Sequence, residues 1–234
     1  MGKRIIQQAR GHGSLTYRTR KQAFKTHISY PSNKEEGNAK VVKLIHSPAY
    51  SSPLAKILFK GRIFYNIAAE GLKEGQEIKI GKSAPPETGN ITSLEYLPVG
   101  TNIFNIESFP GSNGKFVRAS GISAKIVKKE HNAVTLLMPS KEEKKMRQDV
   151  RATVGVVAAG GRTEKPFVKA GKKYYKIKSR GGKIWPRTSA VKMNIVDHPF
   201  GSGRGKRIKS KIAKRNAPPG AKVGHLRPRR TGRK

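Results

Sequence analysis

The acidic residues of this chain are confined to its middle, and this distribution limits what the chain can fold into. Residues 1–30 contain seven Lys and Arg residues and no acid, and residues 201–234 contain thirteen and again no acid. All fourteen Asp and Glu residues lie between Glu35 and Asp197. Ends so rich in cations, Gly, Ser and Pro cannot bury enough apolar surface to offset the entropy lost on ordering. We therefore expect a foldable middle with two basic ends that become ordered on a partner.

The excess charge indicates a polyanionic partner. The chain has 50 Lys and Arg residues against 14 Asp and Glu residues, a formal charge of +36. Self-repulsion at such a charge opposes compaction, and nucleic-acid phosphates can neutralise it. A membrane surface is the other polyanion to weigh, but the basic residues form no amphipathic helical pattern with a bulky apolar face. We expect nucleic acid and no membrane.

Three further features narrow the class of protein. The chain has no Cys, which excludes disulfides and thiolate chemistry, and it shows no signal-like or membrane-spanning apolar run. These features favour a cytoplasmic protein.

The two basic ends could instead be loose solubilising tails that no partner orders. Pro218-Pro219-Gly220 argues against this alternative, because it favours a fixed turn over maximal flexibility.

The middle of the chain has the pattern of short β-strands. Residues 56–69, KILFKGRIFYNIAA, are rich in β-branched and aromatic residues, with Gly61 as a bulge or tight bend. In EGQEIKIG, Ile78 and Ile80 alternate with polar residues, and TNIFNIES is expected to repeat this alternation, with Asn105 and Glu107 on its polar side.

More strands are expected further along. SAKIVKKEHNAVTLLMPS predicts two strands joined at residues 130–132, and RATVGVVAAGG predicts another. SKEEKKMRQDV fits either a short capped helix or a charged hairpin, and we favour the hairpin. Such strand spacing is typical of small antiparallel barrels, and the Pro and Gly residues of Gly81 to Asn90 place a domain boundary there.

The stretch NIVDHPFGSGRGKR, Asn194 to Arg207, raises the question of catalysis. If it is extended, the side chains of Asp197 and His198 point to opposite faces, so Asp197 cannot orient the imidazole as a catalytic relay requires. His198 as a lone general base remains an alternative to a histidine that contacts RNA.

Nucleotide and metal sites find little support. GSGRGKR has three residues between Gly201 and Gly205 where a phosphate-binding P-loop has four, and Arg207 stands in place of its hydroxyl residue. The histidines show no spacing typical of a metal site. We expect no cofactor, although Mg²⁺ can accompany RNA phosphates.

Two segments interleave aromatic residues with cations. SLTYRTRKQAFKTH contains Tyr17 and Phe24, and GKKYYKIKSRGGKIWPR contains Tyr174, Tyr175 and Trp185. Cations contact phosphates and aromatic rings stack on unpaired bases, which favours structured RNA. The alternative is that Tyr174 and Trp185 belong to a barrel core.

The ordered motifs of the chain resemble the ribosomal protein L2 family, most closely its archaeal form. The similarity begins at MGKRIIQQARG-G and continues with LPVGT-I-NIE-FPG--GK--RASG-SA within Gly89 to Ala124. RATVG (Arg151 to Gly155), KAG (Lys169 to Gly171), MN-VDHPFG-G, APPG-KVG and RRTGR follow in order. The similarity runs nearly from end to end.

The resemblance implies an all-β protein with an OB-fold barrel, an SH3-like barrel and long basic irregular extensions. We expect a basic N-terminal extension at residues 1–35, the OB-fold at 36–85, the SH3-like barrel at 86–195 and a basic C-terminal extension at 196–234. The resemblance implies a structural constituent of the large ribosomal subunit, and not an enzyme, that binds large-subunit rRNA and other ribosomal proteins. It also implies support for association with the small subunit and for the peptidyl-transferase region, with direct catalysis through His198 as the alternative.

The basic segments and the resemblance together give the residues expected to bind RNA. They are Lys3, Arg4, Arg10, His12, Arg18, Arg20, Lys21, Arg118, Ser123, Lys169, Lys172, Lys173, Arg180, Lys183, Trp185, Arg187, Asn194, His198, Pro199, Gly201, Gly203, Arg204, Lys206, Arg207, Lys209, Lys222, Arg229, Arg230 and Arg233.

The chain departs from the family pattern in three places. Ile195 replaces a usual Pro, Ser202 interrupts a usual Gly triplet, and Ser189-Ala190 stands where Arg-Gly is common.

Overall fold

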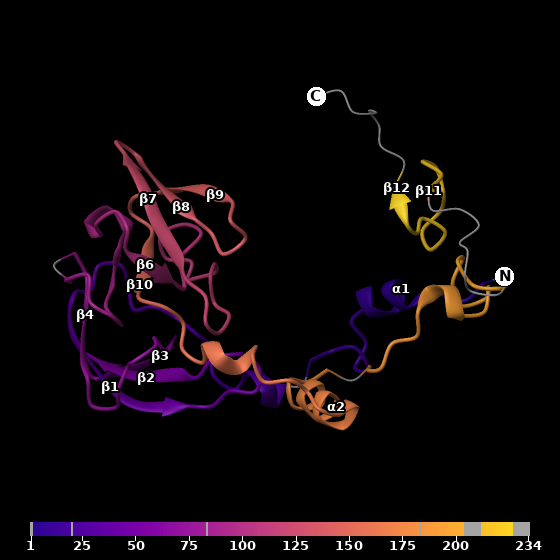
Figure 1. The fold of residues 1–234 in the computed structure, drawn as a ribbon, viewed down its shortest axis with the longest axis horizontal. Coiled ribbons are helices and arrows are strands. Elements are labelled where there is room, and N and C mark those ends of the chain that lie inside the picture. The colour runs from indigo at the N-terminus through magenta and orange to yellow at the C-terminus, as the bar shows by residue number, and fades with distance from the viewer. Residues whose placement is uncertain (1, 20, 83, 183, 204–211, 227–234) are drawn as a thin grey trace. The chain divides into compact units, whose positions relative to one another are not determined.

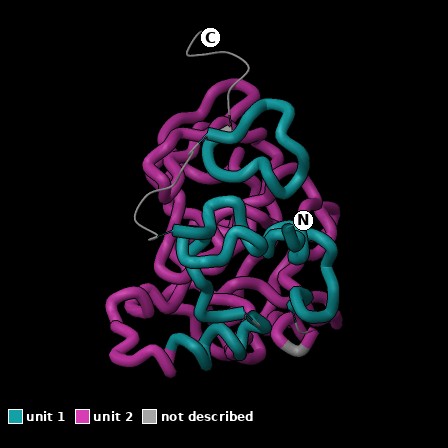
Figure 2. Tube along the Cα trace, turned by 90° about the vertical axis from the view of Figure 1, so that its right-hand side faces the viewer, with its two compact units in different colours: residues 1–20, 173–234 teal, residues 21–172 magenta. Residues whose placement is uncertain are grey.

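A computed structural model describes residues 2–19, 21–82, 84–182, 184–203 and 212–226. The chain divides into two compact units, one of residues 1–20 and 173–234 (unit 1) and one of residues 21–172 (unit 2). Figure 2 shows the two units in different colours.

Unit 2 is built on one ten-stranded sheet in the order β3-β2-β1-β4-β5-β10-β6-β7-β8-β9 (Figure 1). Its strands are β1 (Gly37–Ile45), β2 (Leu54–Phe59), β3 (Arg62–Ile67), β4 (Glu77–Ile80), β5 (Ile91–Ser93), β6 (Asn102–Phe104), β7 (Ala124–Glu130), β8 (Ala133–Leu137), β9 (Glu143–Arg147) and β10 (Arg151–Val154). Every pairing is antiparallel except that of β4 with β5, which consists of the single pair Ile80 and Ile91. The regular secondary structure of the described residues is thus mostly β, as expected.

Short connections explain why sequential strands pair. Lys60 and Gly61, both with positive φ, link β2 to β3, a conformation that matches the twist of a two-residue hairpin. The tight bend predicted at Gly61 is confirmed. The hairpin of β7 and β8, joined at residues 131–132, and the hairpin of β8 and β9 are also confirmed.

A single hydrophobic core extends under the whole sheet. Its fully buried large side chains include Leu54, Ile57, Ile91, Phe104 and Leu136, which come from strands along the length of the sheet. In β4 the buried positions alternate with exposed ones, as the pattern of Ile78 and Ile80 predicted.

The alternation predicted for TNIFNIES is wrong, because Asn105 and Glu107 are as fully buried as Phe104 and Ile106. Asn105 has a left-handed φ of 48°, and β6 ends just before it. A strand that ends inside the unit can bury polar side chains, provided that they find partners there.

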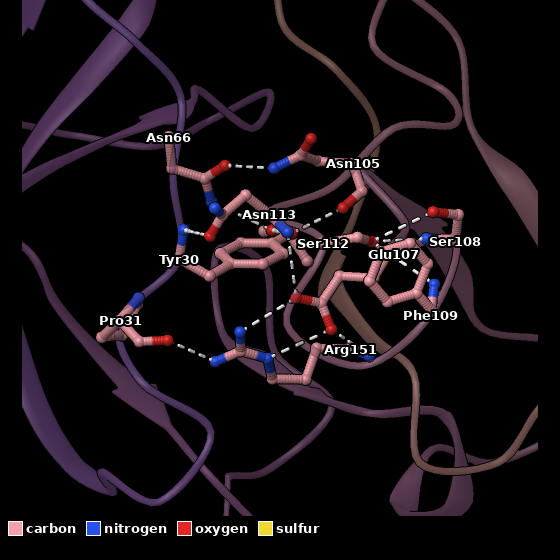
Figure 3. A network of polar contacts seen from close by, with 11 residues as sticks. Tyr30, Pro31, Asn66, Asn105, Glu107, Ser108, Phe109, Ser112, Asn113 and Arg151 are labelled. Carbon is pink, nitrogen blue, oxygen red and sulfur yellow. Dashed lines mark hydrogen bonds and ion pairs between the residues drawn. The ribbon is translucent and has the colours of Figure 1, made fainter.

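These polar side chains form a buried network (Figure 3). The hydroxyl of Tyr30 donates to the Asn105 carbonyl and lies 2.7 Å from the Thr153 hydroxyl. The Asn66 amide donates to the same Thr153 oxygen at 3.0 Å, and the Asn105 amide donates to Asn66 at 2.8 Å. Burial raises the pKa of Tyr30, an effect that the hydrogen bond with Thr153 opposes.

A buried ion pair adjoins this network (Figure 3). Arg151 donates from Nη2 and Nε to the two carboxylate oxygens of Glu107, at 2.9 and 3.3 Å. Its Nη1 donates to the Pro31 carbonyl at 2.7 Å, and its guanidinium lies 5.1 Å from the Tyr30 ring centroid. This arginine is therefore part of the core and does not face a partner.

Within the ranges that the structure describes, the helical segments are few and short. They are α1 (Ile6–Gly11), α2 (Ala170–Ser179) and the 3-10 turns η1 (Lys21–Phe24), η2 (Leu94–Tyr96), η3 (Gly160–Arg162) and η4 (Ala190–Lys192). The strands β11 (Ile212–Ala213) and β12 (His225–Leu226) form a two-stranded parallel pair in unit 1. Neither α1 nor α2 was expected from the sequence. In the described residues, no helix has the length and apolar character needed to cross a membrane.

Candidate RNA-binding surface

Unit 1 concentrates the positive charge of the chain. It carries 25 of the 50 Lys and Arg residues but a single acid, Asp197. The Lys3 ammonium lies 3.9 Å from that carboxylate, and both groups are exposed to solvent. A surface pair of this kind is weak and screened by salt. The unit is left with a large positive charge that a polyanion must offset.

The N-terminal segment packs against the segment that contains the Asp-His pair. The Lys3 backbone N–H donates to the Val196 carbonyl at 2.8 Å, and Arg4 contacts the His12 ring. The turn expected at Pro218-Pro219-Gly220 is present, with Gly220 at a φ of 91° and the Ala221 N–H donating to the Pro218 carbonyl. Cationic segments that are far apart in the sequence therefore lie in one unit.

The extended backbone assumed around His198 is wrong. The N–H groups of Asp197 and His198 both donate to the Asn194 carbonyl, and the Gly201 N–H donates to the His198 carbonyl at 2.8 Å. These bonds fold residues 194–201 into two consecutive turns. A Cβ on Gly201 would lie 2.5 Å from the carbonyl oxygens of Met193 and Asn194, so these turns require glycine at this position.

The contacts of His198 argue against a catalytic relay. Its Nδ1 accepts a hydrogen bond of 3.0 Å from the Phe200 backbone N–H, and its ring packs edge-on against Phe200. In a relay, Nδ1 carries the proton and donates it to the carboxylate. Here Nδ1 is an acceptor, while Asp197 faces Lys3. The hydrogen bond holds the ring in place and suits a positioning role.

The structure shows the local backbone or exposure at two of the three departures from the family pattern. Ser202 has a φ of 69°, in the left-handed region where Gly is the most favourable residue. Ile195 lies in the first turn and is exposed. Nothing in the structure explains the Ser189-Ala190 departure.

The aromatic side chains of the second aromatic-rich segment, residues 171–187, are not core. Tyr174 and Tyr175 lie on α2 and are exposed, so the alternative that Tyr174 belongs to a barrel core is wrong. Trp185 is half-buried outside the hydrophobic core, with the Lys173 ammonium 5.7 Å from its ring centroid.

Most of the predicted RNA-binding residues that the structure describes lie on the surface. The exposed ones are Lys3, Arg4, Arg10, His12, Arg18, Lys21, Lys169, Lys172, Lys173, Arg180, Arg187, Asn194, Pro199, Gly203 and Lys222. The half-buried ones are Arg118, Ser123, Trp185 and His198, and Gly201 is buried. Outside the described residues lie Arg20, Lys183, Arg204, Lys206, Arg207, Lys209, Arg229, Arg230 and Arg233.

Sequence reasoning missed the Glu107–Arg151 pair. Arg151 stands in one of the motifs that carry the resemblance, and an arginine in so basic a chain is more readily assigned to RNA than to a core. The one sequence feature that could have predicted this pair is Glu107, a lone acidic residue within an apolar run. Across the described ranges, no cluster of three or more His, Cys, Asp or Glu residues has the geometry to hold a metal ion.

The sheet-based fold and the nearly acid-free cationic unit define a mostly-β protein suited to binding RNA. Family models for the ribosomal proteins L2 match residues 3–80, as the RNA-binding N-terminal domain, and residues 87–220, as the C-terminal domain. The chain belongs to the ribosomal protein L2 family.

Curated relatives agree over the full length. The large ribosomal subunit protein uL2 of Natronomonas pharaonis is 48% identical, over 100% of this chain and 97% of the relative. The protein of the same name from Archaeoglobus fulgidus is 48% identical over 99% of each chain. That from Haloarcula marismortui is 44% identical over 100% of this chain and 98% of its own. These names describe ribosomal proteins and no enzyme.

Proposed function

We propose that this chain is a structural constituent of the large ribosomal subunit and binds large-subunit rRNA. The observation that carries the proposal is the full-length membership in the L2 family. The charge of unit 1 supports it independently, because 25 cations beside one acid need a polyanion to neutralise them. The protein acts in the cytoplasm as part of the ribosome, where its other partners are ribosomal proteins.

The domain organisation belongs to the same proposal. Residues 36–85 form an OB-fold barrel and residues 86–195 an SH3-like barrel, with basic extensions at residues 1–35 and 196–234. Two observations support the boundary between the barrels: the family models end at residue 80 and resume at residue 87, and among the named strands a single pair, Ile80 with Ile91, links the two halves of the sheet. The extensions thread between rRNA helices.

The finer role concerns the subunit interface and the peptidyl-transferase region. The predicted RNA-binding residues hold rRNA there and support association with the small subunit. His198 positions RNA, because its Nδ1 is held by the Phe200 N–H. Any Mg²⁺ at this surface is bound by RNA phosphates, with the protein supplying cations around it.

Salt dependence tests the binding. If the protein neutralises about ten phosphates, its affinity for a large-subunit rRNA fragment should fall roughly 10⁵-fold between about 50 and 200 mM salt. Competition with duplex DNA supplies the control. An affinity for the rRNA fragment that does not change with salt would contradict the proposed role. Equal affinities for duplex DNA and rRNA would also contradict it and would indicate a general nucleic-acid-compacting protein.

A further inference from the structure

The two aromatic-rich segments of the sequence meet around one pocket in unit 1. The pocket has a volume of about 630 Å³, and its lining includes Arg10, Tyr17, Ile177, Ile184, Trp185 and Arg187. Sites for small organic ligands commonly measure about 300–1,000 Å³. This pocket is therefore large enough for a single nucleotide.

Four of the side chains that line the pocket are apolar or aromatic. Tyr17, Ile177, Ile184 and Trp185 are all half-buried, while Arg10 and Arg187 are exposed. Aromatic rings that stay partly accessible can stack on a base, because every nucleobase offers a flat face.

The chain reaches this arrangement through a glycine turn after α2. Gly181 has a φ of 82°, and a Cβ on Gly182 would lie 2.6 Å from Cγ2 of Ile177 and 3.0 Å from its carbonyl oxygen. The Gly182 N–H donates to that carbonyl at 2.9 Å, which closes the end of the helix. The turn ends α2 shortly before Ile184 and Trp185 in the sequence, and larger residues would obstruct it.

The pocket is also positively charged. Arg10 and Arg187 line it, the Lys173 ammonium lies 5.7 Å from the Trp185 ring centroid, and the described lining residues include no acid. Guanidinium groups pair with phosphate through two parallel hydrogen bonds. An apolar side chain of a partner would form no ion pair with the two arginines, and a bare phosphate would not stack on the aromatic rings.

We propose that this pocket binds one unpaired nucleotide of RNA, with its base against Tyr17 and Trp185 and its phosphate on Arg10 and Arg187. The inference rests on the proposed rRNA-binding function and adds a specific site to it. A base within a duplex cannot enter, because its faces are stacked on its neighbours.

The single tryptophan of the chain makes the site directly observable. The fluorescence of Trp185 is followed while the full-length protein is titrated with a short single-stranded RNA, with the same RNA in duplex form, with AMP and with ribose 5-phosphate. The single-stranded RNA and AMP should quench the fluorescence saturably, whereas duplex RNA and ribose 5-phosphate should not. Quenching by ribose 5-phosphate equal to that by AMP would overturn the role of the base, and equal quenching by the duplex would overturn the requirement for an unpaired nucleotide.

Variants test the lining. Tyr17→Ala should weaken binding of single-stranded RNA about tenfold, the value of one base-stacking contact. Arg187→Gln, which keeps the apolar lining, should reduce the salt slope of binding by about 1. The matched controls are Tyr96→Ala and Arg215→Ala, which change exposed residues outside the pocket and should leave the Trp185 response unchanged.

The outcomes separate this proposal from the proposed function. If the variants at Tyr17 and Arg187 bind an rRNA fragment as the unchanged protein does, and Trp185 does not respond, the pocket proposal fails while rRNA binding stands. If the unchanged protein does not bind the rRNA fragment at all, the proposed function fails. Circular dichroism confirms that each variant is folded, and Tyr17→Phe, which keeps the ring, should retain the binding that Tyr17→Ala loses.

Discussion

Replacing Arg151 by alanine should lower the free energy of unfolding of unit 2 by about 4 kcal/mol, because it leaves a buried carboxylate without its cation. The side chain of Glu107 is 0% exposed and that of Arg151 is 9% exposed. The substitution removes two hydrogen bonds to the carboxylate and the one to the Pro31 carbonyl. Truncating one partner of a buried pair typically costs about 3–5 kcal/mol, since the remaining charge keeps its desolvation penalty.

Urea unfolding followed by far-UV circular dichroism measures this loss, in enough salt to screen the basic ends. Trp185 fluorescence is the wrong probe, because that residue lies in unit 1. The matched control is Arg147→Ala, which removes an arginine paired with Asp149 at 2.5 Å through side chains that are 71% and 49% exposed. This exposed pair should contribute at most about 1 kcal/mol.

A double variant separates lost charge compensation from lost packing. Glu107→Gln combined with Arg151→Met removes both charges, while the amide oxygen introduced at position 107 can still accept from the backbone N–H of Asn113 or of residue 151, so no buried charge is left without a partner. The double variant should therefore be more stable than Arg151→Ala alone. If Arg151→Ala costs no more than Arg147→Ala, the reasoning that burial makes this pair important is refuted.

Two further predictions concern alkaline pH and His198. The raised pKa of Tyr30 means that the unfolded chain loses this proton first, so unit 2 should keep its stability below about pH 10 and lose about 1.4 kcal/mol per pH unit above it. Urea unfolding against pH should show this decline, and in Tyr30→Phe the contribution of this group should disappear; an unchanged alkaline slope would contradict the assignment. In assembled ribosomes, His198→Ala should impair assembly or subunit joining and leave peptide-bond formation nearly unchanged, as measured by single-turnover peptidyl transfer. A loss of about 10²–10⁴ in that chemical step would instead indicate a general base.

Local pattern was enough to predict much of the sheet. The bend at Gly61, the alternation of Ile78 and Ile80, and the two hairpins of β7, β8 and β9 are properties of neighbouring residues. The alternation of polar and apolar residues gave the wrong prediction at Asn105 and Glu107. A polar residue between apolar ones is expected to face solvent, and this expectation fails when a residue distant in the sequence pairs with it inside the core. Their partners, Asn66 and Arg151, lie 39 and 44 residues away in the sequence.

For the basic surface, too, the sequence was enough for some conclusions and insufficient for others. The sequence by itself determined that the chain needs a polyanion, because charge sums are independent of conformation and the two ends contain no acid. It also determined the family, through ordered motifs along the whole length. It left open whether Arg151 faces RNA or the core, and it gave the wrong backbone for residues 194–201.

The tertiary structure alone decided which of these charges lie inside and which segments lie together. Burial and pairing depend on contacts between residues far apart in the chain, as when Arg151 meets Glu107 and the carbonyl of Pro31. The same holds for the pocket, where Tyr17 and Trp185 are far apart in the sequence and line one surface. Composition fixed the kind of partner, and long-range packing fixed the residues that can reach it.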